Sequence, residues 1–110
     1  MDQEELNHLL KSPDQFKEIW LEGKNGESLC ALINGNIGWL MYLRFEGDAG
    51  FSSRNPSISI DEDVEYFLCN GQKDIYPKSW TYHIDKLTEA MQSLLKDGQL
   101  PHQLEWHDDS

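Results

Sequence analysis

Cysteine is scarce in this chain, which has two, Cys30 and Cys69, among 110 residues. Two cysteines cannot make the dense disulfide framework that holds many small secreted domains together. Each lies within an apolar, strand-like pattern. We therefore expect both to be small buried hydrophobic residues and not a disulfide or a redox pair.

Basic residues are also few. Nine Lys and Arg stand against 20 Asp and Glu, giving a formal net charge of −11. This charge repels phosphate backbones and anionic lipid headgroups, so it argues against direct binding to nucleic acid or to a membrane. No apolar run approaches the about 20 residues that span a bilayer. The start, MDQEELNHLL, is acidic and lacks the apolar stretch of a secretory signal, so we expect a cytoplasmic protein.

The common catalytic motifs are missing as well. The sequence has no phosphate loop and no GxSxG, HExxH or CxxC. His102, His107 and Asp108 are possible metal ligands, but their spacing does not supply converging ligands, and a solvated acidic C-terminus is the simpler interpretation. We predict no catalytic residue, no cofactor and no metal.

The sequence that is present predicts one α+β domain over residues 1–110, a mainly antiparallel β-sheet of about five to seven strands with two helices packed on it. Asp2 is placed to cap a first helix, which has a stripe of Leu6, Leu9 and Leu10. A second helix should end at Gly98, with Pro101 beyond it. Residues 46–63 look irregular, with a short strand or a packed loop among them. The main expected strands are 16–21, 28–33, 37–45, 64–69, 73–76 and 103–107.

The strand at 64–69 has apolar residues on both faces, so we expect it to lie inside the sheet. Asn70-Gly71 predicts a type I′ turn after it. Trp106 has the inward phase of the closing strand, and we assign it to the core.

The densest acidic run lies just before and within this strand. The simplest interpretation is a solvated loop. A calcium site would need the ligand spacing and glycine of an EF-hand loop, and a contact surface for a basic protein is the other alternative. We expect a rigid acidic ridge with aromatic neighbours, in contrast to a mobile tail bearing Asp108 and Asp109. The candidate binding residues are Asp61, Glu62, Asp63, Glu65, Asp74, Tyr76 and Trp80.

Residues 37–107 carry a family resemblance. The run from Glu65-Tyr66 through Gly71 and Pro77 is followed by a helix with Ala90 and Leu94. Gly98, Pro101 and Leu104-Glu105-Trp106 come next, and Gly-x-x-Pro-x-x-hydrophobic-x-Trp is the most specific part. This pattern resembles immunity protein family one of bacterial polymorphic-toxin and contact-dependent inhibition systems. The stretch GFSSRNP departs from it.

The resemblance implies a small bacterial cytoplasmic protein that binds and neutralises the toxin domain encoded beside it. Such toxins are often nucleic-acid deaminases or nucleases, so the expected partner is basic. Gly98, Pro101 and Trp106 match as fold determinants, and the family has no fixed toxin-binding residues. Two other functions remain open: an acidic adaptor or nucleic-acid mimic that inhibits another basic protein, and a small metal-dependent enzyme.

Overall fold

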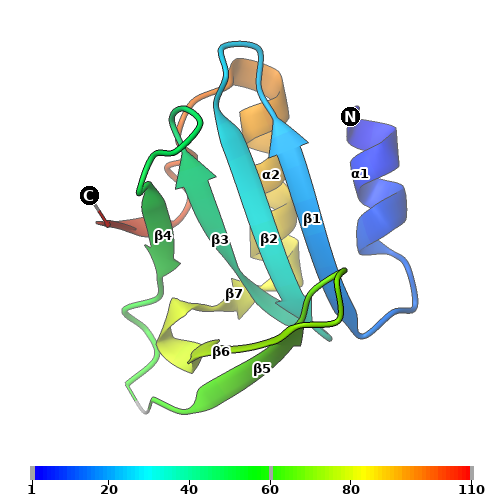
Figure 1. Cartoon of the computed structure of the whole chain (residues 1–110), viewed down its shortest axis with the longest axis vertical. Helices are drawn as coiled ribbons and strands as arrows, with labels where there is room; N and C mark the ends of the chain where they lie inside the picture. The colour runs from blue at the N-terminus through cyan, green and yellow to red at the C-terminus, as the bar shows by residue number, and fades with distance from the viewer. Residues whose placement is uncertain (1, 60, 110) are drawn as a thin grey trace.

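The computed structural model describes residues 2–59 and 61–109, and within them it has eight strands, two α-helices and one short 3-10 helix (Figure 1). The predicted α+β class is confirmed, with one strand more than the predicted range. The elements are α1 Gln3–Leu10, β1 Phe16–Glu22, β2 Ser28–Asn34, β3 Ile37–Leu43, β4 Phe51–Arg54, β5 Asp63–Phe67, β6 Lys73–Pro77, η1 Lys78–Trp80, β7 Tyr82–His83, α2 Ile84–Asp97 and β8 Glu105–Asp108.

The main sheet is antiparallel and has the strand order β1-β2-β3-β4-β8, with β7 paired to the start of β3. The first three predicted strands form an antiparallel meander, and β3 lies inside the sheet between β2 and β4. A fourth strand, β4, lies at Phe51–Arg54, inside the stretch expected to be irregular. The short strand or packed loop was also expected from the alternating Ile58 and Ile60; Ile58 lies in the loop beyond β4, and Ile60 falls outside the described residues.

Both helices cover one face of this sheet (Figure 1). The Asp2 side chain accepts a hydrogen bond from the Glu5 backbone N–H at 2.8 Å, so the predicted cap of α1 is confirmed. Leu6 and Leu10 are buried, whereas Leu9 is 39% exposed and does not belong to the core. The second helix ends as predicted at Gly98, whose φ of 73° is the left-handed conformation that glycine adopts most easily.

The hairpin β5–β6 covers part of the opposite face, and here the prediction of an internal strand is wrong. β5 pairs with β6 in a separate two-stranded sheet. Its inner face packs Tyr66 against Leu32 and Trp39 of the main sheet, whereas Phe67 and Ile75 on the outer face are 40% and 50% exposed. The presence of apolar residues on both faces of residues 64–69 therefore does not predict an internal strand, because the outer strand face of a hairpin can also carry exposed apolar side chains.

The hairpin turn also differs from the prediction. A type I′ turn needs a positive φ at both central residues. Among the described residues only glycines have a positive φ; Gly71 has 86° and Asn70 does not. The Gly71 N–H donates to the Leu68 carbonyl and the Leu68 N–H to the Gln72 carbonyl, each at 2.9 Å. This is the three-residue connection that ends with a left-handed glycine.

The C-terminal segment is fixed, so the expectation of a mobile tail is wrong for Asp108 and Asp109. Asp108 lies in β8, which pairs with β4. Asp109 accepts a hydrogen bond from the Ser52 hydroxyl at 2.7 Å, and its N–H donates to the Gly50 carbonyl at 2.9 Å. Trp106 is half-buried against the main core, as its inward phase predicted, and its indole N–H donates to the Pro101 carbonyl at 2.5 Å.

Candidate functional site

The predicted acidic ridge is exposed, but its charges have partners nearby. Asp61, Glu62, Asp63 and Glu65 are all exposed. The Glu65 carboxylate lies 3.7 Å from the Lys73 ammonium, and the Glu62 carboxylate lies 3.9 Å from that of Lys78. The Asp61 carboxylate accepts a hydrogen bond from a backbone N–H in η1. Exposed pairs of this kind are weak, so the ridge keeps its acidic character.

Of the other three predicted residues, Asp74 and Tyr76 lie on the inner face of the hairpin, and Trp80 lies in η1 directly after it. Tyr76 is paired with Val64 and Asp74 with Tyr66, which places both on the inner face. The Tyr76 ring lies 4.5 Å from the Trp39 ring and 5.5 Å from that of Trp80, between centroids. Tyr76 and Trp80 therefore pack in an aromatic cluster, and the structure does not bring them or Asp74 together with the ridge on one face.

The hairpin leaves much of the sheet face uncovered, and this surface was not predicted. Opposite the helices, Trp20, Cys30 and Met41 form one cross-strand row, and Glu22, Ser28 and Leu43 form the next. We call these two rows the open sheet face. A groove of ≈ 510 Å³ lies on it, lined by Trp20, Glu22, Gly23, Gly26, Glu27, Ser28, Leu43, Glu46 and Gly47.

Trp20 is the exposed aromatic residue of this face, with 46% of its surface accessible. Its indole N–H donates to the Glu18 carboxylate at 2.8 Å. The other oxygen of Glu18 accepts from the Cys69 backbone N–H in the hairpin turn at 2.9 Å. That backbone hydrogen bond, followed by the one from Trp20, lowers the pKa of Glu18. Glu18 thus holds the ring in place and ties the hairpin to the sheet.

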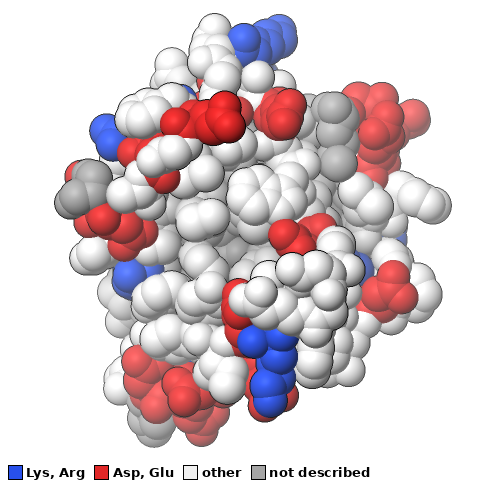
Figure 2. Space-filling model, in the orientation of Figure 1, with Lys and Arg blue, Asp and Glu red and all other residues white. Residues whose placement is uncertain are grey.

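Carboxylates border the open sheet face. Glu18 beside Trp20, Glu22 at the end of β1 and Glu46 after β3 surround its apolar centre. Figure 2 shows this side of the molecule, with uncharged side chains in the middle, Asp and Glu around them, and fewer Lys and Arg. An apolar centre with a border of one charge is suited to a partner of the opposite charge.

The two cysteines differ in their surroundings. Cys30 belongs to the first row of the open sheet face but is itself buried, in the cluster with Leu32, Trp39 and Tyr66, and burial raises the pKa of its thiol to about 12. Cys69 is exposed in the hairpin turn, so the prediction that it is buried is wrong. The predicted strand ran two residues past the end of β5, because the chain turns directly after Leu68.

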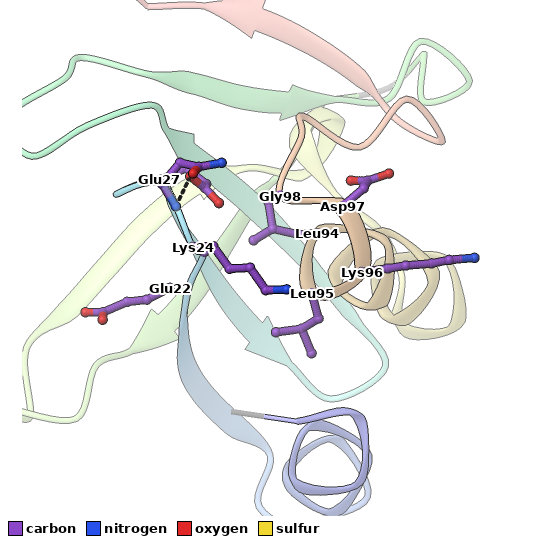
Figure 3. Close-up of a pocket in the computed structure, with 10 residues that line it drawn as sticks. Glu22, Lys24, Glu27, Leu94, Leu95, Lys96, Asp97 and Gly98 are labelled. Carbon is purple, nitrogen blue, oxygen red and sulfur yellow. Dashed lines mark hydrogen bonds between the residues drawn. The ribbon is translucent and has the colours of Figure 1, made fainter.

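A second pocket lies on the helix side of the β1–β2 connection (Figure 3). Its volume is ≈ 360 Å³, and it is lined by Glu22, Gly23, Lys24, Asn25, Glu27, Leu94, Leu95, Lys96, Asp97 and Gly98. Glu27 is only 4% exposed, and one of its carboxylate oxygens accepts from the Asn25 backbone N–H at 3.1 Å. No local sequence pattern predicts this pocket, because Glu27 stands in an ordinary turn sequence.

Residues 2–59 and 61–109 contain no group of three or more His, Cys, Asp or Glu side chains that could hold a metal ion. Within the described residues, neither α1 nor α2 is long and apolar enough to cross a membrane.

No family model and no curated protein matches the chain.

Proposed function

We propose that this protein binds a cognate toxin domain that acts on nucleic acid, a deaminase or a nuclease, and neutralises it by covering its active site. The observation that carries the proposal is Trp20, an exposed aromatic ring fixed by Glu18 on an open sheet face with an acidic border. Tryptophan is enriched among the residues that dominate binding energy at interfaces. The family resemblance of residues 37–107 supports the same function.

The mechanism is occlusion without chemistry. An active site that handles nucleic acid needs basic residues to hold phosphates. A protein with a net charge of −11 is attracted to such a cleft, and the carboxylates around Trp20 can pair with its lysines and arginines. Because Glu18 already fixes the Trp20 ring, little side-chain freedom is lost on binding.

The test is calorimetric titration of the toxin domain encoded beside this gene. Neutralisation requires almost no free toxin, so the dissociation constant should be about nanomolar or tighter. Trp20→Ala should weaken binding at least tenfold, by removing the central aromatic contact. Phe67→Ala, which truncates an exposed aromatic residue on the outer face of the hairpin, is the matched control and should change it little. No binding to the neighbouring toxin would refute the proposal.

An acidic adaptor or nucleic-acid mimic is the second candidate. The exposed ridge of Asp61, Glu62, Asp63 and Glu65 favours it, because a row of carboxylates can stand in for phosphates. Such a protein would bind many basic proteins with similar affinity. The proposed inhibitor binds its own toxin far more tightly than unrelated basic domains, so a small panel of these domains distinguishes the two functions.

A further inference from the structure

The Glu27 carboxylate has an unusual environment. One of its oxygens, Oε2, accepts from the Asn25 N–H, whereas Oε1 is buried and has no hydrogen-bond partner in the described part of the chain. A buried carboxylate without a full set of partners is costly, and most such groups in native proteins are paired or hydrogen-bonded. Its position therefore points to a positively charged group that is supplied from outside.

Two glycines make room for this carboxylate. A Cβ atom at Gly23 would lie 1.6 Å from Oε1, and one at Gly98 would lie 2.7 Å from it. Any side chain at Gly23 would displace the carboxylate, and one at Gly98 would crowd it. The β1–β2 connection and the end of α2 are thus shaped around Oε1, which lies between them (Figure 3).

The pocket is also electronegative at the end of α2. The last carbonyls of an α-helix lack intrahelical partners and carry a partial negative charge. The 14-residue helix α2 ends here, and Glu22 and Asp97 add carboxylates to the lining. The charge of Glu27 also acts on Tyr42: burial raises the pKa of the Tyr42 hydroxyl, and the negative charge of Glu27 raises it further. Such an environment favours a cation.

The lysines that line the pocket do not neutralise Glu27. Figure 3 shows the Lys24 side chain running toward Leu95 and Lys96 extending away from the pocket. Among residues 2–59 and 61–109, neither lysine forms an ion pair with Glu27. The pocket also shares Glu22, Gly23 and Glu27 with the groove on the open sheet face, so Glu27 stands in the wall between two hollows.

We propose that this pocket binds an organic cation, a guanidinium or primary ammonium group on a short aliphatic chain. The charged group pairs with Glu27 and donates N–H bonds to the last carbonyls of α2, while the aliphatic chain lies against Leu95. A bare metal ion fits poorly, because ≈ 360 Å³ and one buried carboxylate do not make the compact set of oxygen ligands that such ions require. This site does not depend on the proposed function.

The test is an NMR titration of the labelled protein with ethylguanidinium, using the uncharged isostere ethylurea as control. Ethylguanidinium should shift the amide signals of Gly23, Leu95 and Gly98 saturably. The dissociation constant should be about 1–10 mM, as expected for so small a ligand. Ethylurea should produce no saturable shift. If neither compound causes one, or if both do equally, the proposal is wrong.

Variants identify the residue responsible. Glu27→Gln keeps the shape but removes the charge, and it should weaken ethylguanidinium binding at least tenfold. Glu89→Gln removes an exposed carboxylate of α2 that does not line the pocket and should change binding less than threefold. Lys24→Gln removes a competing cation and should not weaken binding. Unchanged binding by Glu27→Gln would overturn the assignment, and if that variant does not fold, the comparison with ethylurea still decides.

A last arm distinguishes the sources of the cation. An arginine residue blocked at both ends presents the group as a protein side chain does, whereas agmatine presents it as a small free molecule. Equal binding of both supports a side chain of a partner protein as the occupant, and binding of agmatine alone supports a free small cation. If neither blocked arginine nor agmatine competes with ethylguanidinium, the shifts do not arise from this pocket and the proposed site is wrong.

Discussion

At the scale of single residues, the two thiols differ in exposure and should differ in reactivity. The thiolate is the reactive form, and burial of Cys30 raises the pKa of its thiol to about 12. Cys69 is exposed in the hairpin turn. We predict that an aromatic disulfide reagent modifies one thiol per folded molecule at pH 8 and that Cys69→Ser abolishes this fast reaction.

Denaturant provides the control for that prediction. In the unfolded wild-type protein both thiols should react, and in unfolded Cys69→Ser one should. Fast modification of the folded Cys69→Ser protein would mean that Cys30 is accessible and that the covering of the sheet face around it opens readily.

Residues of the candidate sites were predictable only where local sequence sets exposure. The carboxylates of the ridge were expected to be exposed, and they are. The roles of Trp20 and Glu27 depend on contacts with residues far along the chain, Cys69 in the hairpin turn through Glu18 and Gly98 at the end of α2. No local pattern encodes such contacts. The inner-face position of Tyr76 and Trp80 likewise follows from how the hairpin docks.

At the scale of elements, the closing strand provides the next prediction. Trp106 packs its half-buried ring against the main core from the last strand of the sheet. Trp106→Ala should lower the free energy of unfolding by about 3 kcal/mol, at the low end for aromatic truncation because the ring is not fully buried. Urea denaturation followed by circular dichroism measures this difference.

Trp20→Ala is the matched control for that measurement, since it truncates the same residue type at a position that is 46% exposed. It should cost about 1 kcal/mol or less. If both variants lost the same stability, Trp106 would not be part of the core. The control also shows that the Trp20 variant used in the binding test is folded.

Elements with strong local signals were predicted well. The cap at Asp2, the end of α2 at Gly98 and the strands β1, β2 and β3 all lie where the sequence indicated. The errors concern pairing. β5 has the apolar residues of an internal strand, and only the docking of the hairpin's aromatic inner face on Trp39 shows why β5 and β6 form a separate layer. Strand pairing is a long-range property that periodicity alone does not contain.

At the scale of the whole molecule, the proposed function separates two contributions to binding. Long-range attraction between a protein of net charge −11 and a basic partner acts on the association rate and is screened by salt. Close packing of an anchored aromatic residue acts mainly on the dissociation rate. The exposed ridge is suited to the first role and Trp20 to the second.

The last prediction tests this division by stopped-flow kinetics with the cognate toxin. Reversing Asp61, Glu62 and Asp63 to Lys should slow association about tenfold at low salt and flatten its salt dependence, with little change in the dissociation rate. Trp20→Ala should speed dissociation and leave the association rate and its salt dependence nearly unchanged. Asp109 accepts a hydrogen bond from Ser52, so deleting the C-terminus would disturb the sheet and is not a suitable control. The control is charge reversal of three exposed acids on the helix side, Glu4, Asp85 and Glu89. Both triple variants change the net charge equally. If the helix-side variant slows association as much as the ridge variant, net charge alone steers the encounter, and the ridge has no special part in it.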